Sequence, residues 1–343
     1  MLAAVALMAA GLPPPGAPPA TVPDEETRLT IAASGDFLVH SPVFNQALTN
    51  GGGRRYDFAP MFGPIRRWIE GSDLALCHVE TPLVPGTPTG YPLFRTPPNL
   101  AAAIRSTGWD ACSTASNHSL DVGQAGINST IRTLRRVGIP FDGTARSARG
   151  ARRSPILTAD GVRVAFLAYT AVSNGQLVPH PWSLNFASAK RILADARAAR
   201  RTGANAVIVN LHWGAEYQHS PTPEQRALAR RLTRSPDITA IVGQHVHVVQ
   251  PIRRVNGKIV VFGEGNLVSN QDAACCPAAS QDGLIALLQL ELEDGEPVVR
   301  RARYVPVWVR RPDFAVVEAP PESWRRTVGV VGRRSYLQPA TTP

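Results

Sequence analysis

Six short apolar runs, five of them ending beside an acidic, amide or imidazole side chain, constrain the fold of this chain more than any other feature. The runs cover residues 28–34, 73–78, 111–115, 204–211, 237–242 and 258–262. Continuous apolar runs of this length are typical of strands buried on both faces of a sheet. Helical periodicity lies between them, at 60–70, 98–106, 127–137, 187–201 and 222–234. This alternation predicts a layered α/β core.

Two further regions indicate antiparallel strands. Residues 156–169 turn at Asp160-Gly161, and residues 282–309 turn at Asp294-Gly295. An Asp-Gly pair between apolar segments favours a hairpin. We therefore expect mixed rather than purely parallel sheets.

Possible metal ligands gather where the apolar runs end. In layered α/β proteins the carboxyl ends of the strands share one edge, where ligands bind. His245 and His247 form a His-x-His pair, which on an extended segment points both rings to one face. Imidazole and carboxylate donors together suit Mn, Fe or Zn. We expect two divalent cations in one crevice. The candidate residues are Asp36, Glu80, Asn117, His118, His212, His245 and His247. Taken singly, His78 is expected to be structural or at the surface.

Composition narrows the function classes. The chain of 343 residues is 44% hydrophobic and 18% charged, which excludes global disorder. The net charge is +10, and Lys190 and Lys258 are the only lysines. The scattered arginines reflect either compositional bias or an anionic ligand held by guanidinium forks. No basic stripe interleaved with aromatic residues is present, so nucleic acid is not an expected partner.

The four cysteines do not form a Cys-x-x-Cys motif. Cys77 and Cys112 lie in apolar runs and are predicted to be buried thiols. The neighbouring Cys275 and Cys276 fit either a redox pair or two free thiols.

The chain divides into three parts in this interpretation. Residues 1–12 resemble the apolar core of an export signal, and a Pro-rich linker extends to 27. This predicts an extracytoplasmic, envelope or secreted protein. The basic region that precedes the apolar core of such a signal is missing. Either the start codon is placed too late, or the run is merely an apolar tail. We expect one domain at 28–310 and a basic tail at 311–343.

Seven motifs, taken in order, carry a resemblance to a known family. They include SGDFL at 34–38, SNHSLDVG at 116–123 and GQHVHVVQ at 243–250; the others lie at 73–83, 94–98, 211–217 and 265–266. The chain resembles the CapA family of capsule-synthesis proteins, named for poly-γ-glutamate capsules, in the calcineurin-like metallophosphatase superfamily. The resemblance spans about residues 28–310. It implies a four-layer αββα sandwich of the α+β or α/β class with mixed sheets.

The resemblance also implies roles for individual residues. Asp36 and His247 would bind the first metal, and Glu80 would bridge both metals. Asn117, His212 and His245 would bind the second. His118 would protonate the leaving group, and His40 is a possible extra ligand. Residues expected at the substrate are Arg95, Glu216, Tyr217 and Glu264. The chain departs from the family at His78, where Asn is common, at Val246, where Pro is usual, and at Glu264, where an apolar residue is usual.

The functional expectation is a metal-dependent hydrolase that makes, anchors or trims a capsule polymer of the poly-γ-glutamate type. Its substrate would be an anionic polymer or phosphoester, and its partners a capsule synthesis or export complex. The alternatives are a non-catalytic polymer-binding or export component and a general metallophosphodiesterase.

Overall fold

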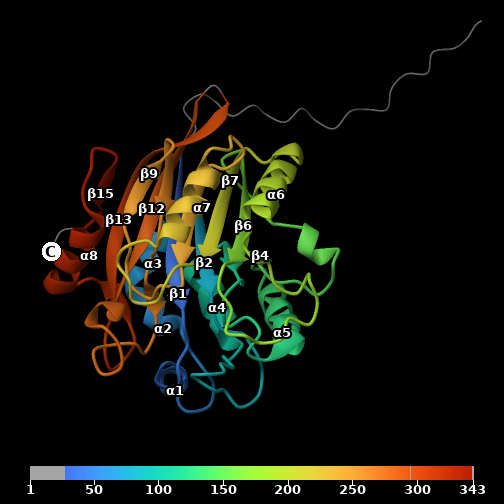
Figure 1. Cartoon of the computed structure of the whole chain (residues 1–343). Helices are drawn as coiled ribbons and strands as arrows, with labels where there is room; N and C mark the ends of the chain where they lie inside the picture. Colours follow the sequence, from blue (N-terminus) through green and yellow to red (C-terminus); the bar gives the residue numbers. More distant parts are fainter. Residues whose placement is uncertain (1–27, 294, 342–343) are drawn as a thin grey trace, which may run out of the picture.

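The computed structural model describes residues 28–293 and 295–341. The predicted export-signal segment and linker, residues 1–27, lie outside the described residues. Two β-sheets pack against each other and carry helices on their outer faces (Figure 1). The expected four-layer αββα arrangement with mixed sheets is confirmed.

The first sheet joins four consecutive parallel strands, and a short strand parallel to the first of them, to a long antiparallel pair. Its order is β14-β13-β12-β1-β2-β3-β4, with β11 beside β1 and β15 beside β13. The parallel strands are β1 (Arg28–Phe37), β2 (Leu74–Val79), β3 (Ala111–Ser113) and β4 (Phe141–Asp142). The remainder are β11 (Asn266–Val268), β12 (Asp282–Glu293), β13 (Glu296–Val309), β14 (Val316–Glu318) and β15 (Leu337–Pro339).

The second sheet has antiparallel strands only at its edges. Its order is β5-β6-β7-β8-β10-β9, and β6, β7, β8 and β10 run parallel. The strands are β5 (Ile156–Ala159), β6 (Val162–Thr170), β7 (Ala206–His212), β8 (Ala240–Gln244), β9 (Ile252–Val255) and β10 (Lys258–Val261). The parallel centre of this sheet explains the continuous apolar runs. The antiparallel pair of β5 and β6 is the hairpin predicted at 156–169.

Five predicted helical segments are present, one of them interrupted, and the structure adds two helices that were not predicted, α1 (Ser41–Asn50) and α8 (Pro321–Val331). The others are α2 (Ala59–Phe62), α3 (Arg66–Glu70), α4 (Asn99–Thr107), α5 (Gly123–Arg136), α6 (Ala189–Arg201) and α7 (Pro223–Thr233). The helix predicted at 60–70 is divided by a 3₁₀ turn at Gly63–Ile65, because Pro64 has no N–H to continue an α-helical ladder. By contrast, α7 begins where Thr222 and Gln225 form a capping box.

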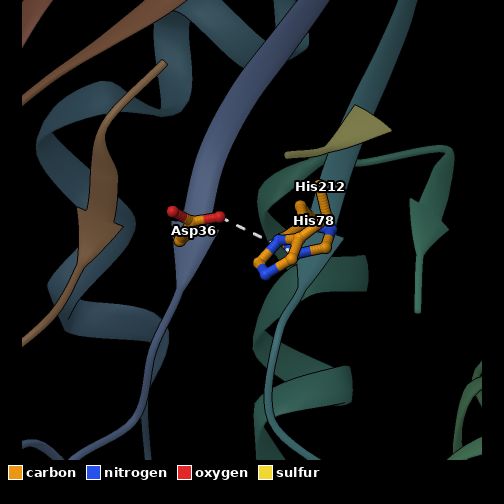
Figure 2. Close-up of side chains that lie close together, drawn as sticks. All are labelled: Asp36, His78 and His212. Carbon is orange, nitrogen blue, oxygen red and sulfur yellow. Dashed lines mark ion pairs between the residues drawn. The ribbon is translucent and has the colours of Figure 1, made fainter. Parts of the chain in front are cut away.

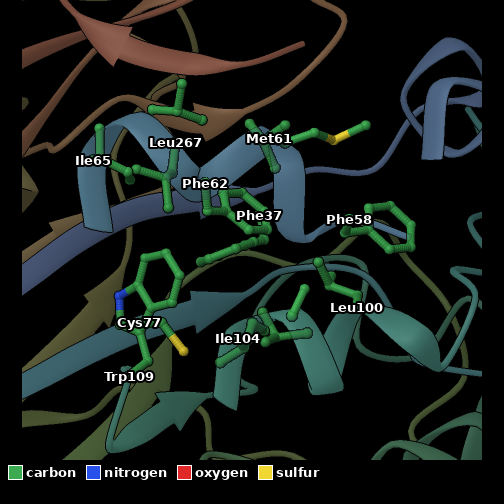
Figure 3. Close-up of a cluster of buried hydrophobic side chains, with 14 of the residues drawn as sticks. Phe37, Phe58, Met61, Phe62, Ile65, Cys77, Leu100, Ile104, Trp109 and Leu267 are labelled. Atoms are coloured by element: carbon green, nitrogen blue, oxygen red, sulfur yellow. The ribbon is translucent and has the colours of Figure 1, made fainter. Parts of the chain in front are cut away.

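Three apolar clusters define the layers. Between the sheets, β1 residues such as Ile31 pack against second-sheet residues such as Val164. On the outer face of the first sheet, Phe37 and Trp109 meet residues of α2 and α4 (Figure 3). On the outer face of the second sheet, Ile192 and Leu232 bring α6 and α7 onto the strands. Strands buried on both faces hold their carboxyl ends in fixed positions.

Residues after 310 belong to the folded body. The sequence analysis expects a basic tail there, but β14 and β15 both pair with β13. Between them, α8 buries Trp324 and Val331. The strands β14 and β15 have three residues each and carry no periodic signal, and the sequence analysis did not identify the helix α8. Arg326 binds the buried Asp282 of β12 at 2.8 Å, which ties this segment to the first sheet.

The cysteine prediction is half right. Cys77 and Cys112 are buried, but they form a disulfide and are not free thiols. They face each other in the register of the parallel strands β2 and β3, with Cα atoms 4.4 Å apart. Pairing depends on strand register, which the sequence alone does not give. Cys275 and Cys276 are free.

Within residues 28–293 and 295–341, no helix combines the length and apolar character needed to cross a bilayer.

A buried carboxylate connects the two sheets. Asp142 of β4 accepts a hydrogen bond of 2.8 Å from the Ala168 backbone N–H of β6, and Ser154 donates to the same oxygen. Burial raises the pKa of Asp142 to about 7, although these hydrogen bonds oppose the rise. The native state therefore keeps a proton that the unfolded chain loses near pH 4.

This pKa predicts a pH-dependent difference between Asp142→Asn and the wild type. As pH rises from 4 to 7, only the unfolded wild-type chain deprotonates at this site, so its unfolding free energy falls. The unfolding free energy of Asp142→Asn relative to that of the wild type should therefore rise by a few kcal/mol, up to about 4, over this pH range. Urea denaturation of metal-free protein across this range measures it. The exposed Asp160→Asn serves as control. Parallel pH curves for Asp142→Asn and the wild type would contradict the assignment.

Candidate metal centre

Strands from both sheets end at one cluster of buried polar side chains. Asp36 is near the end of β1, and Glu80 directly follows β2. His212 ends β7, and His245 directly follows β8. All four are buried, as is His247. The parallel strands thus bring together the residues that the sequence analysis expected at one edge.

Asp36 is the centre of this cluster. Its neighbours in register are His78 on β2 and Asn266 on β11. The His245 backbone N–H lies 3.2 Å from Oδ2, and His247 Nδ1 lies 3.2 Å from the same oxygen. These contacts fix the orientation of the carboxylate toward the histidines.

Glu80 lies beside two of the histidines without a hydrogen bond. Its Oε1 is 3.7 Å from His247 Nε2 and 4.0 Å from His212 Nε2. Neither carboxylate oxygen has a hydrogen-bond partner among the described residues. Burying an ionised carboxylate in this way costs several kcal/mol unless a positive charge compensates it.

Asn117 and His212 offer a further pair of possible metal ligands. His212 Nε2 is 2.8 Å from Asn117 Oδ1, and the His212 and His245 ring centroids are 4.6 Å apart. Asn117 Nδ2 donates to Asn174 Oδ1 at 3.1 Å, so the amide oxygen of Asn117 faces the histidine.

Three groups of side chains offer ligand atoms within 4.8 Å of one another. They are Asp36 with Glu80 and His247, Asp36 with His78 and His212, and Glu216 with His245 and His247. Asp36 and His247 each belong to two groups. Overlapping sets of carboxylate and imidazole donors suit divalent transition metals.

The pKa values show how strongly the cluster is removed from water. Burial raises the pKa of Glu80 well above its usual value. It lowers the pKa of His245 to about 3 and that of His212 well below the usual value. Burial also acts to lower the pKa of His247, but attraction to Glu80 and a hydrogen bond to Asp36 outweigh it and raise the pKa to about 9. The cluster therefore favours positive charge between its carboxylates.

His118 stands at the side of this cluster in a different setting. Its Nδ1 is 2.9 Å from Asp121 Oδ2, and the ring meets Phe94 edge-on at 4.7 Å. Asp121 is held in turn by the Phe94 backbone N–H at 2.7 Å. Because Nδ1–H donates its hydrogen bond to Asp121, Nε2 is the ring atom left for another partner.

The backbone of the His-x-His pair differs from the prediction. His245 and His247 have φ values of 91° and 55°, so they do not lie on an extended segment. Their rings are 5.9 Å apart and both belong to the cluster. Left-handed backbone at non-glycine residues is costly and concentrates at functional sites. Consecutive turns, which residue spacing does not reveal, bring the rings together.

His40 does not join any of the three donor groups. It occupies the N-cap position of α1 without a side-chain capping bond, and its Nδ1 lies 3.2 Å from both the Leu38 carbonyl and the Asn270 backbone nitrogen. Burial lowers its pKa to about 4. Among the described residues, its contacts are those of a structural histidine next to the cluster.

The residues expected at the substrate separate into two sets. Glu216 is exposed and has a ligand atom within 4.8 Å of ligand atoms of His245 and His247, and Tyr217 lies 6.2 Å from the His247 ring. Arg95 donates to the Pro85 carbonyl at 3.4 Å, and no contact joins it to the cluster in the part of the chain described. Glu264 is fully buried, accepts a hydrogen bond from Gln244 at 2.6 Å and belongs to none of the three donor groups.

The sequence analysis left His78 out of the ligand set, yet the structure places it in the cluster. Its imidazole is fully buried and stacks on His212 at 4.8 Å. The available signal was its position two residues before Glu80 on a buried strand, because side chains at that spacing point to the same face.

Comparison with known proteins connects these observations to a family. The profile described as bacterial capsule synthesis protein PGA_cap matches residues 30–271. The capsule biosynthesis protein CapA of Bacillus anthracis is 27% identical over 293 residues, covering 80% of this chain and 70% of that protein. The PGA biosynthesis protein CapA of Bacillus subtilis (strain 168) is 29% identical over 170 residues, covering 49% of this chain and 44% of that protein.

A solved structure shares the fold. The calcineurin-like phosphoesterase YfkN from Bacillus subtilis aligns with a TM-score of 0.50 and 17% identity, covering 89% of this chain and 96% of that chain. At this identity the likeness concerns the fold alone. It agrees with the expected metallophosphatase-like architecture.

Proposed function

Because the chain belongs to the bacterial capsule synthesis protein family PGA_cap, we propose that it is a metal-dependent hydrolase acting on a capsule polymer of the poly-γ-glutamate type. The observation that carries this proposal is the convergence of buried carboxylate and imidazole atoms from both sheets. Such a set is costly to bury and gains a compensating charge when cations bind.

The donor chemistry fits two divalent cations. Unpartnered buried atoms occur on Glu80, His212 and His245 among the described residues. Asp36 and His247 would hold the first cation, and Asn117, His212 and His245 the second, with Glu80 between them. Mn, Fe or Zn suit this mixture of donors. When bound, these ions supply Lewis acidity toward an ester or amide oxygen.

The remaining chemistry belongs to side chains at the edge of the cluster. Asp121 fixes the His118 ring through Nδ1, so a protonated ring holds its second proton at Nε2 for a leaving group. Glu216 and Tyr217 lie on the substrate side. Bound anionic polymer would bring negative charge to this side, where the bound cations would attract it.

The proposed location is outside the cytoplasm, in the envelope, together with other capsule-synthesis components. The disulfide between Cys77 and Cys112 supports this, since disulfides persist in oxidising compartments. The capsule role of the relatives supports it independently.

Glu80→Ala tests the metal centre. Removing the carboxylate placed between the two donor sets should lower bound metal by at least about one equivalent, because a shared ligand serves both ions. Elemental analysis of the purified full chain measures this, with the exposed Glu322→Ala as control. A full metal complement in Glu80→Ala would exclude the bridging role.

His118→Ala tests the catalytic assignment. The variant should keep its metal and lose roughly 10²–10⁴-fold in turnover, the usual contribution of a general acid. Assays use bis-(p-nitrophenyl) phosphate and poly-γ-glutamate as separate probes. Turnover equal to the wild type would remove His118 from the reaction. A metal-loaded wild type that binds poly-γ-glutamate but cleaves neither probe would favour a binding component over a hydrolase.

A further inference from the structure

His78 is, with Glu80, one of two side chains of the cluster whose polar atoms are all buried without a hydrogen-bond partner among the described residues. It is fully buried, and neither Nδ1 nor Nε2 has a hydrogen-bond partner among the described residues. A neutral imidazole offers one donor and one acceptor, and leaving such groups unpaired costs about 1–3 kcal/mol each. Buried polar groups of this kind are rare and call for a physical explanation.

The strand register aims His78 at the first carboxylate of the site. His78 and Asp36 are paired neighbours on β2 and β1, and His78 Nε2 lies 3.7 Å from Asp36 Oδ1. On its other side, the His78 ring stacks on His212 with centroids 4.8 Å apart and planes 28° apart (Figure 2). The ligand atoms of all three residues lie within 4.8 Å of one another.

These separations suit joint coordination. Two ligands about 2.1 Å from one tetrahedral ion lie about 3.4 Å apart, close to the 3.7 Å between His78 and Asp36. A direct hydrogen bond at 3.7 Å is too long. Stacking on a second imidazole gives His78 packing contact but satisfies neither of its nitrogens.

We propose that His78 is a further ligand of the first cation, beside Asp36, and that it shifts the metal preference of the site. This inference rests on the metal centre of the proposed function and adds a donor to it. A further imidazole favours Zn or Co over Mn, because nitrogen donors suit these ions better than oxygen-rich sites do.

The test compares wild type, His78→Leu and the control His180→Leu as full chains. His180 is exposed and lies outside the three donor groups. Zinc affinity is measured by chelator competition, and thermal unfolding is recorded with and without zinc. His78→Leu should bind zinc at least about tenfold more weakly, since even indirect partners of metal ligands contribute about 10–100-fold. Its zinc-induced increase in Tm should shrink accordingly.

The metal-free proteins separate a ligand from a packing residue. A ligand role predicts that metal-free His78→Leu unfolds at or above the wild-type temperature, because the unpaired nitrogens are gone. A lower metal-free Tm with unchanged zinc affinity would overturn the proposal and assign His78 to packing.

A second variant covers the case in which His78→Leu does not fold. His78→Asn keeps a polar side chain and replaces an imidazole with an amide oxygen, so the ratio of zinc to manganese affinity should fall at least about tenfold. The visible absorption of bound Co²⁺ should change with it. An unchanged ratio and spectrum would overturn the proposal. If the wild type binds none of these metals, the proposed function fails as well. If the wild type binds them and the His78 variants bind them equally tightly, only the role of His78 is excluded.

Discussion

Burial of negative charge where two sheets meet is the constraint on which the site depends. Asp36 and Glu80 are removed from water, and neither can be ionised there without nearby positive charge. His247 supplies part of it, which is why its pKa is raised against the effect of its own burial. Burial lowers the pKa of His212 and His245, which favours their neutral forms. Metal binding requires neutral imidazoles and ionised carboxylates, so a bound cation would replace the His247 proton as the compensating positive charge.

Much of the fold could be predicted from the sequence because its central strands are buried on both faces. Such strands appear as unbroken apolar runs, and the residues that end them fall at one edge of a layered protein. Asp36, Glu80, His212 and His247 were found in this way. The short strands after residue 310 were missed because three-residue strands carry no periodic signal.

Other features depend on distances that no local pattern encodes. The pairing of Cys77 with Cys112 follows from the register between β2 and β3. The place of His78 follows from the register between β1 and β2. The turns at His245 and His247 adopt backbone angles that are unfavourable for non-glycine residues, so local propensity could not predict them. The resemblance to a family located the site, but it did not show how these side chains contact one another.

The disulfide has a consequence for how this protein is handled. Cys77 immediately precedes His78 on β2, and Cys112 lies on the neighbouring strand that leads to Asn117 and His118. The covalent link therefore clamps two of the segments that carry the cluster. Dithiothreitol present while the chain folds would keep these two thiols from pairing, and it chelates transition metals through its own thiols. Preparations made under reducing conditions would thus differ from oxidised ones in both backbone restraint and metal content.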